Sequence, residues 1–179
     1  MAAGHGSNSI SVFYLTNKLT KEEDEDVKAE FTLLRGFEAD YDYELDKQCC
    51  FVPWKPGKDG KDDGTLEDMW EIYWMVVVSN QGHFPNPPGP IFFIDYQSGC
   101  DRTIIMADCH FYNYDCRSGI PEDLRGVPYP YIQGLTYGRI LGRDAHPAFH
   151  NINNGPKDFD GYMDEDEKYN FPRPDWPLH

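Results

Sequence analysis

The sequence predicts a single α/β domain with a mixed, largely buried sheet of about five strands and two or three helices, followed by an acidic tail. Two short apolar runs, residues 72–78 and 91–96, predict buried strands, because they are rich in β-branched and aromatic residues and do not alternate polar with apolar. A capped segment over residues 20–36 predicts a helix. We expect the domain to span residues 1–155 and the tail to span residues 156–179.

A first strand is expected at residues 10–16, and the first helix follows it. Thr20 and Glu23 have the spacing of a capping box, in which the Thr hydroxyl accepts from the third helical N–H and the Glu carboxylate reaches back. Acidic residues crowd the first turn, where the helix dipole favours them. Apolar residues then recur at helical spacing (Val27, Phe31 and Leu34), and Gly36 is a typical helix stop.

The middle of the chain combines a loop, a short helix and a strand. Residues 53–64 have the Lys, Asp and Gly content of a surface loop. Thr65 and Asp68 then resemble a second helix cap. We expect this helix to last one or two turns before residues 71–79 take over as a central strand.

The second half begins with a connector and a hairpin. Residues 81–90 carry four prolines and predict an extended connector. Residues 91–96, a Ser-Gly turn and residues 103–107 then predict an antiparallel hairpin. Residues 132–141 fit either a strand or a short helix, and no core-forming pattern remains from Asn151 onward.

Charge restricts the expected partners. Sixteen Lys and Arg residues stand against 31 Asp and Glu residues, which gives a net charge of -15. Such a surface repels phosphate backbones and anionic lipids, so we expect neither nucleic acid nor membrane as a partner. A basic protein, a small apolar molecule or a divalent cation remains compatible. The alternative is that the charge only keeps the protein in solution.

The chain has no signal-peptide pattern at its start and no apolar run of membrane-spanning length. Its five cysteines are an odd number without framework spacing, which favours free thiols in a reducing compartment. A cytoplasmic location is therefore the expectation.

The candidate catalytic residues are Asp95, Asp108 and His110, since ligands gather at strand ends in open α/β sheets. They are acid–base groups that could face one cavity. A tight hairpin would place Asp95 and Asp108 at opposite ends of the sheet, which weakens a paired-carboxylate mechanism. No nucleophile elbow, phosphate loop or dinucleotide fingerprint is present.

A first metal candidate pairs His146 with His150, because histidines four residues apart share a helix face and can bind zinc. Pro147 fits a helix best as its first residue, which would leave His146 at the cap with its side chain aimed elsewhere. The alternative is a pair of loop histidines.

A second metal candidate is a partial calcium-loop pattern. Four carboxylates and Gly161 fall on template positions, and the carboxylates suit a hard cation: Asp158, Asp160, Asp164 and Glu167. Pro156 occupies the first position and cannot ligate through its side chain. The alternative is a solvated acidic tail.

The order of residues 70–107 resembles a family of small α/β proteins of bacteria and fungi that has no assigned activity. The resemblance rests on YWMVVV, a Pro-containing connector, PIFFIDY, a Gly turn and DRTIIMA, with ISVFYLTN and its helix in similar places. It implies the α/β fold and carries no functional residue to this chain. The KPGKDGKDDG loop and the acidic tail depart from the family.

Three functions follow, in order. The first is an acidic intracellular binding domain without a catalytic motif, which engages a basic partner. The second is a small cofactor-independent enzyme, such as an isomerase, cyclase or hydrolase, with an aromatic-lined pocket and Asp and His acid–base groups. The third is a protein that binds calcium or zinc.

Overall fold

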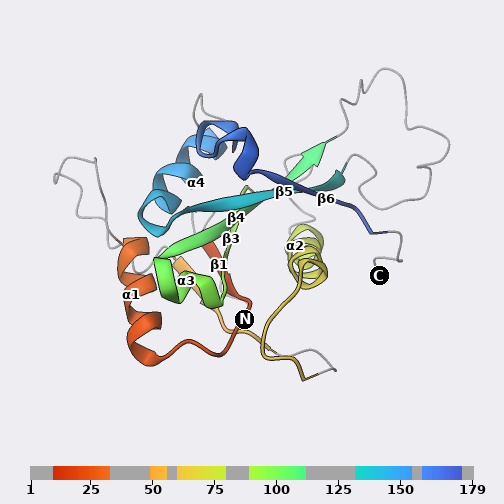
Figure 1. The fold of residues 1–179 in the computed structure, drawn as a ribbon. Helices are drawn as coiled ribbons and strands as arrows, with labels where there is room; N and C mark the ends of the chain where they lie inside the picture. The colour runs from red at the N-terminus through yellow and green to blue at the C-terminus, as the bar shows by residue number, and fades with distance from the viewer. Residues whose placement is uncertain are drawn as a thin grey trace, which may run out of the picture.

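The computed structural model describes residues 10–32, 49–55, 60–79, 89–111, 132–154 and 159–174. Within them the chain forms one mixed sheet with helices on both faces (Figure 1). The predicted α/β class is therefore confirmed, with six strands where about five were expected.

The sheet has the strand order β2-β1-β3-β4-β5-β6. The first three strands pair in parallel, and each later strand pairs with its neighbour in antiparallel fashion. The bounds are Ile10–Tyr14 for β1, Cys49–Val52 for β2, Ile91–Ile94 for β3, Thr103–Phe111 for β4, Ile132–Leu141 for β5 and Tyr169–Pro172 for β6.

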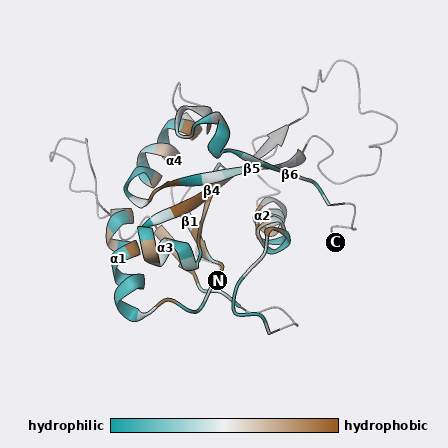
Figure 2. Cartoon of the chain, viewed as in Figure 1, coloured by the Kyte–Doolittle hydropathy of each residue, from teal (hydrophilic) through white to brown (hydrophobic). Residues whose placement is uncertain are grey.

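Apolar cores lie on both faces of the sheet. On one face, α1 (Lys21–Thr32) and α4 (Ala145–Asn154) pack on alternate strand residues such as Phe92 and Ile94. On the other face, α2 (Leu66–Ser79) packs on Phe93 and its neighbours. All four residues of β3 are buried, as expected of a strand covered on both sides. Figure 2 shows the hydrophobic β1 and β4 beside the largely hydrophilic α1.

Both predicted helix caps are present. The Glu23 backbone N–H donates to the Thr20 hydroxyl at 3.2 Å, and the Thr20 N–H donates to the Glu23 carboxylate at 2.7 Å. Thr65 and Asp68 make the same reciprocal pair at the start of α2. Each such cap stabilises its helix by about 1 kcal/mol.

The strand predicted at residues 71–79 is wrong, because these residues continue the helix that Thr65 begins. The buried residues of α2 fall at helical spacing: Met69, Trp70, Tyr73 and Trp74. Their large side chains cover the sheet only when the backbone is helical, and this packing outweighs the strand preference of the Val-rich end. No helix among the described residues is long and apolar enough to cross a bilayer.

The predicted antiparallel pairing of residues 91–96 with residues 103–107 is confirmed over residues 91–93 and 105–107, but the connection is not a simple turn. A short helix, α3 (Tyr96–Asp101), joins the two strands. Residues 132–141, which fitted either a strand or a helix, form β5.

The segment after α4 contributes to the sheet although its sequence shows no core-forming pattern. Residues 169–172 form β6 on the edge of β5, and Met163 is buried against the core that α1 and α4 cover. Gly138 of β5 permits this approach, because a Cβ there would lie 2.3 Å from the Met163 Sδ.

Candidate functional site

The topology marks one edge of the sheet as the place for a ligand. Strand β1 lies between β2 and β3. From the end of β1 the chain runs through α1 to β2 on one side, and from the end of β3 it runs through α3 to β4 on the other side. The chain therefore diverges at the carboxyl ends of β1 and β3. In open α/β sheets this divergence leaves a crevice in which ligands bind.

The loop after β1 is held in place at this edge. The Thr16 hydroxyl donates to the Asp63 carboxylate at 2.7 Å, and Lys18 forms an ion pair with the same carboxylate. These two donors hold the pKa of Asp63 below its usual value. The Asp63 contact in turn raises the pKa of Lys18. These contacts join the loop that precedes α1 in the sequence to the loop that precedes α2.

Tyr96 is the exposed aromatic residue of this edge. It begins α3, its side chain is 54% exposed, and it lies close enough to Lys18 to contribute electrostatically to that residue's raised pKa. Two exposed carboxylates lie on the same segments: Asp62 directly precedes Asp63, and Asp101 is the last residue of α3. We call Lys18, Asp62, Asp63, Tyr96, Gln97 and Asp101 the carboxyl-edge surface. It carries three carboxylates and one ammonium group.

Asp95, the first candidate catalytic residue, lies at this edge as expected but has two structural partners. One carboxylate oxygen accepts from the backbone N–H and the hydroxyl of Ser98, each at 3.0 Å, and so caps α3. The other oxygen forms an ion pair with Arg139 of β5. This arrangement holds α3 and β5 to the end of β3, which is a positioning role.

Asp108 and His110 do not join Asp95. Ile91 is in register with Ala107 and Phe93 with Ile105, so Asp108 lies beside the start of β3 while Asp95 follows its end. At about 3.4 Å per residue, the two aspartates are on the order of 15 Å apart. The His110 backbone pairs with Gly134 at the same far end, and its side chain lies outside the described part of the chain. The predicted acid–base set is therefore not brought together at one place.

At the carboxyl end of β1, a second polar contact joins the strand to α1. The Tyr14 hydroxyl donates to the Asp24 carboxylate, and Lys28 forms an ion pair with Asp24 at 2.7 Å. The Lys28 Nζ also lies 5.8 Å from the centre of the Tyr14 ring. Burial and the Asp24 carboxylate together raise the pKa of Tyr14, so its hydroxyl remains protonated and acts as a donor.

The two candidate histidines lie within a helix, and the expectation that His146 sits at a cap is wrong. Helix α4 begins at Ala145, so Pro147 occupies its first turn, where its missing N–H needs no partner. The His146 and His150 rings share one face, with centroids 6.3 Å apart. His146 is 3% exposed, and its Nε2 lies 3.4 Å from the Sγ of Cys49.

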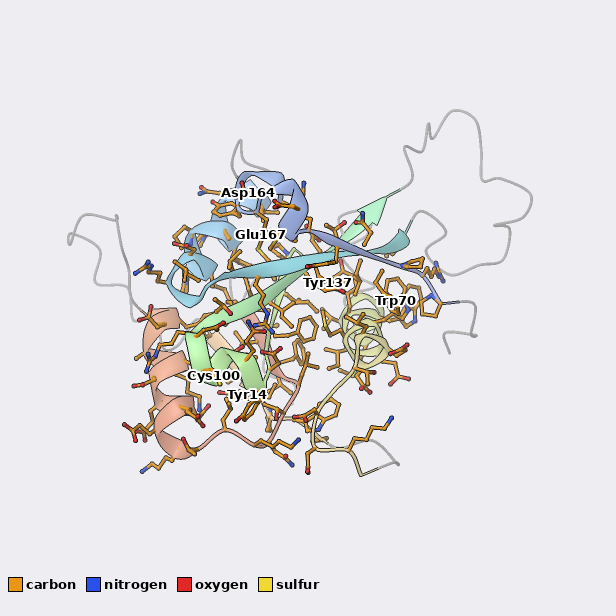
Figure 3. The ribbon with its side chains drawn as sticks, in the orientation of Figure 1. Tyr14, Trp70, Cys100, Tyr137, Asp164 and Glu167 are labelled. Atoms are coloured by element: carbon orange, nitrogen blue, oxygen red, sulfur yellow. The ribbon has the colours of Figure 1, made fainter. Side chains whose placement is uncertain are left out.

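The acidic segment is only partly described. Asp158 and the Asp160 side chain lie outside the described residues, whereas Asp164 and Glu167 are exposed around the short helical turn 165–167. Figure 3 shows these two residues on the segment before β6, away from Tyr14. Among the described residues, no three His, Cys, Asp or Glu side chains gather closely enough to hold a metal ion. Neither the calcium nor the zinc prediction thus gains a ligand set there.

Sequence reasoning missed two residues that the fold brings forward. Tyr96 follows β3 and is exposed because it begins the short helix α3. The spacing of Asp95 and Ser98, which form a capping box, was the sequence signal for that helix. Cys49 meets His146 across 97 positions, and no local pattern announces such a contact.

Comparison of the chain with family models, with curated proteins and with solved structures finds no match. The resemblance to the family of small α/β proteins stays a prediction.

Proposed function

We propose that the protein is a binding domain that engages a basic segment of a partner protein at the carboxyl-edge surface. The observation that carries the proposal is the exposed Tyr96 beside exposed carboxylates at the edge where this topology diverges. Aromatic faces attract Lys and Arg side chains, and the carboxylates add charge complementarity.

The charge of the whole chain favours the same class of partner. A net charge of -15 raises the rate of encounter with cationic segments and repels anionic ones. The local surface repeats this bias, because its one ammonium group, Lys18, is already paired with Asp63. Asp62 then remains available to a partner's cations, whereas the Asp101 carboxylate already accepts from Thr103 and Gln97.

The roles of Asp95 support binding over catalysis at this edge. A general acid or base must reach a proton on its substrate, whereas both oxygens of Asp95 hold α3 and Arg139. The groups that face outward at this edge are Tyr96, Gln97 and the exposed carboxylates, which suit recognition.

The test compares two tyrosines of similar exposure. Tyr96 is 54% exposed at the carboxyl-edge surface, and Tyr169 is 57% exposed on β6. Fluorescently labelled oligolysine is titrated by anisotropy against the parent protein, Tyr96→Ala and Tyr169→Ala. We expect Tyr96→Ala to weaken binding about twofold to thirtyfold, the range of a cation–π contact, and Tyr169→Ala to leave it unchanged.

Equal effects of the two substitutions would reject the proposed site. Asp62→Asn provides a second arm, because it removes a charge without disturbing the Asp63 contacts, and it is expected to weaken binding more at low salt. Truncation after Asn154 is a poor test of the acidic segment, because it would remove β6 and expose the edge of β5.

A further inference from the structure

The carboxyl-edge surface already holds one cation, the ammonium group of Lys18. Lys18 forms an ion pair with the Asp63 carboxylate, and this contact does most to raise its pKa. Asp62 and Tyr96 add to the increase through their electrostatic interaction with the same ammonium. Carboxylates and an aromatic ring are the groups that the proposed function assigns to a partner's cation. Here they act on a cation of the chain itself.

Asp63 keeps its position through contacts that do not involve Lys18. Its backbone forms an isolated antiparallel bridge with Thr16, and the Thr16 hydroxyl donates to its Oδ1 at 2.7 Å. Beside this bridge, the Gly64 N–H donates to the Leu15 carbonyl at 2.6 Å. The fold therefore places the carboxylate at the surface, and a cation that binds there does not have to order this segment first.

A structural role explains the contact between Lys18 and Asp63 poorly. Their side chains are 44% and 47% exposed, and exposed ion pairs contribute little to stability. The attraction in such a pair is nearly balanced by hydration and by the freedom of the long side chain, so the pair opens readily. A second cation can therefore reach the carboxylate whenever the Lys18 side chain moves away.

The contacts of Asp63 favour a lysine over an arginine. Its Oδ1 accepts from Thr16, whereas its Oδ2 is the atom that meets the Lys18 ammonium. A compact ammonium matches a single oxygen, while a guanidinium gains most from two parallel bonds to both oxygens of a carboxylate. The Thr16 hydroxyl hinders the second of these bonds.

We propose that the Asp63 carboxylate is the binding position for a lysine of the partner, and that Lys18 is an internal competitor that fills this position in the free protein. The inference rests on the proposed function, because it names the residue type that the basic segment must present. A partner's lysine replaces Lys18 at Oδ2. The apparent affinity is therefore reduced in proportion to the fraction of molecules in which this oxygen is free.

The experiment titrates labelled oligolysine by anisotropy against the parent protein, Lys18→Gln and Lys21→Gln. Lys21 is the matched control, because it also pairs with an exposed carboxylate, that of Glu25 at 3.6 Å, and its substitution changes the net charge equally. If Lys18 pairs in about half to five sixths of the molecules, Lys18→Gln should strengthen binding about twofold to sixfold. Lys21→Gln should strengthen it less than about 1.5-fold, because more distant charges are largely screened at about 0.15 M salt.

Oligoarginine of the same length tests the type of residue. Lys18→Gln should strengthen oligoarginine binding less than it strengthens oligolysine binding, because the guanidinium gains less from the freed oxygen. Equal gains for the two peptides would overturn the assignment of a lysine. Lys18 is exposed, so its substitution should leave the fold intact, which circular dichroism checks.

The outcomes separate this inference from the proposed function. No gain in Lys18→Gln, or the same gain in Lys21→Gln, would overturn the role of Lys18 as a competitor. The proposed function would still stand if the parent binds oligolysine and Tyr96→Ala weakens that binding. Absence of binding in all three proteins would reject the proposed function and this inference together.

Discussion

Asp95 should be a structural residue, and its substitution separates two contributions to stability. Its carboxylate caps α3 through Ser98 and forms an ion pair with Arg139. The side chains of Asp95 and Arg139 are 26% and 28% exposed, so the pair is shielded from water more than a surface pair is. Loss of a helix cap costs about 1 kcal/mol, and loss of a shielded ion pair costs about 1–2 kcal/mol.

Asp95→Ala removes both contacts and should lower the free energy of unfolding by about 2–3 kcal/mol. Asp95→Asn keeps an oxygen for the Ser98 N–H but removes the charge, and it should cost about 1–2 kcal/mol, since Asn caps helices as well as Asp does. At about 2–4 °C per kcal/mol for a chain of this size, Asp95→Ala should lower the Tm by about 4–12 °C.

The assay is urea unfolding at pH 7, followed by circular dichroism, with a double-mutant cycle that combines Asp95→Asn and Arg139→Gln. The coupling energy isolates the ion pair and should be about 1 kcal/mol. In the Asp95 variants Arg139 keeps one partner, because its guanidinium also donates to the Thr103 hydroxyl at 3.1 Å. A coupling energy near zero, or Asp95→Ala within about 0.5 kcal/mol of the parent, would refute the structural role.

Two further predictions concern packing and pH. Gly138→Ala should lower the free energy of unfolding in urea by about 1–3 kcal/mol, because its Cβ would meet the Met163 Sδ at 2.3 Å. Gly142→Ala is the control and should cost less, because the nearest atom to its Cβ lies at 3.1 Å. Equal costs would contradict the packing of the Met163 segment on β5. The lowered pKa of His146 means that the unfolded chain binds a proton there, near pH 6.5, before the folded chain does, so stability should fall as the pH decreases from about 6.5 towards 4. His146→Gln should flatten that part of the pH profile relative to the parent, and an unchanged slope would show that His146 is protonated normally in the folded state.

The sequence was a reliable guide where the signal is local. The Thr20 and Thr65 caps depend on residues three positions apart, and both are present. The strands predicted at residues 10–16 and 91–96 are present at residues 10–14 and 91–94. The second was predictable because a sheet covered on both faces leaves a continuous apolar run.

The helix α2 shows why composition misled the prediction at residues 71–79. Val76 and its neighbours favour strands by propensity, and an apolar run of this length does not distinguish a buried strand from a buried helix. The decisive signal was the spacing of Trp70, Tyr73 and Trp74, which continues the helix that Thr65 caps. Packing of these rings on the sheet is a tertiary effect that overrides local preference.

The candidate sites were harder to predict because they depend on distant pairings. Asp95 was placed at the right edge from its position after a strand, but its partner Arg139 comes from β5. The thiol of Cys49 and the ring of His146 meet only because β2 and α4 pack on the same face of the sheet. Strand β6 was equally hard to predict, because this short, mostly exposed strand forms only by pairing with the edge of β5.

We propose that a basic segment of a partner binds at the carboxyl ends of β1 and β3, and this proposal can be tested directly. The most direct measurement is a titration of the isotope-labelled protein with oligolysine, followed by backbone amide shifts in two-dimensional NMR spectra. If the basic segment binds there, the largest shifts fall in the loop after β1, at Asp62 and Asp63, and in α3. Shifts spread evenly over the acidic residues, or concentrated at Asp164 to Glu167, would contradict it.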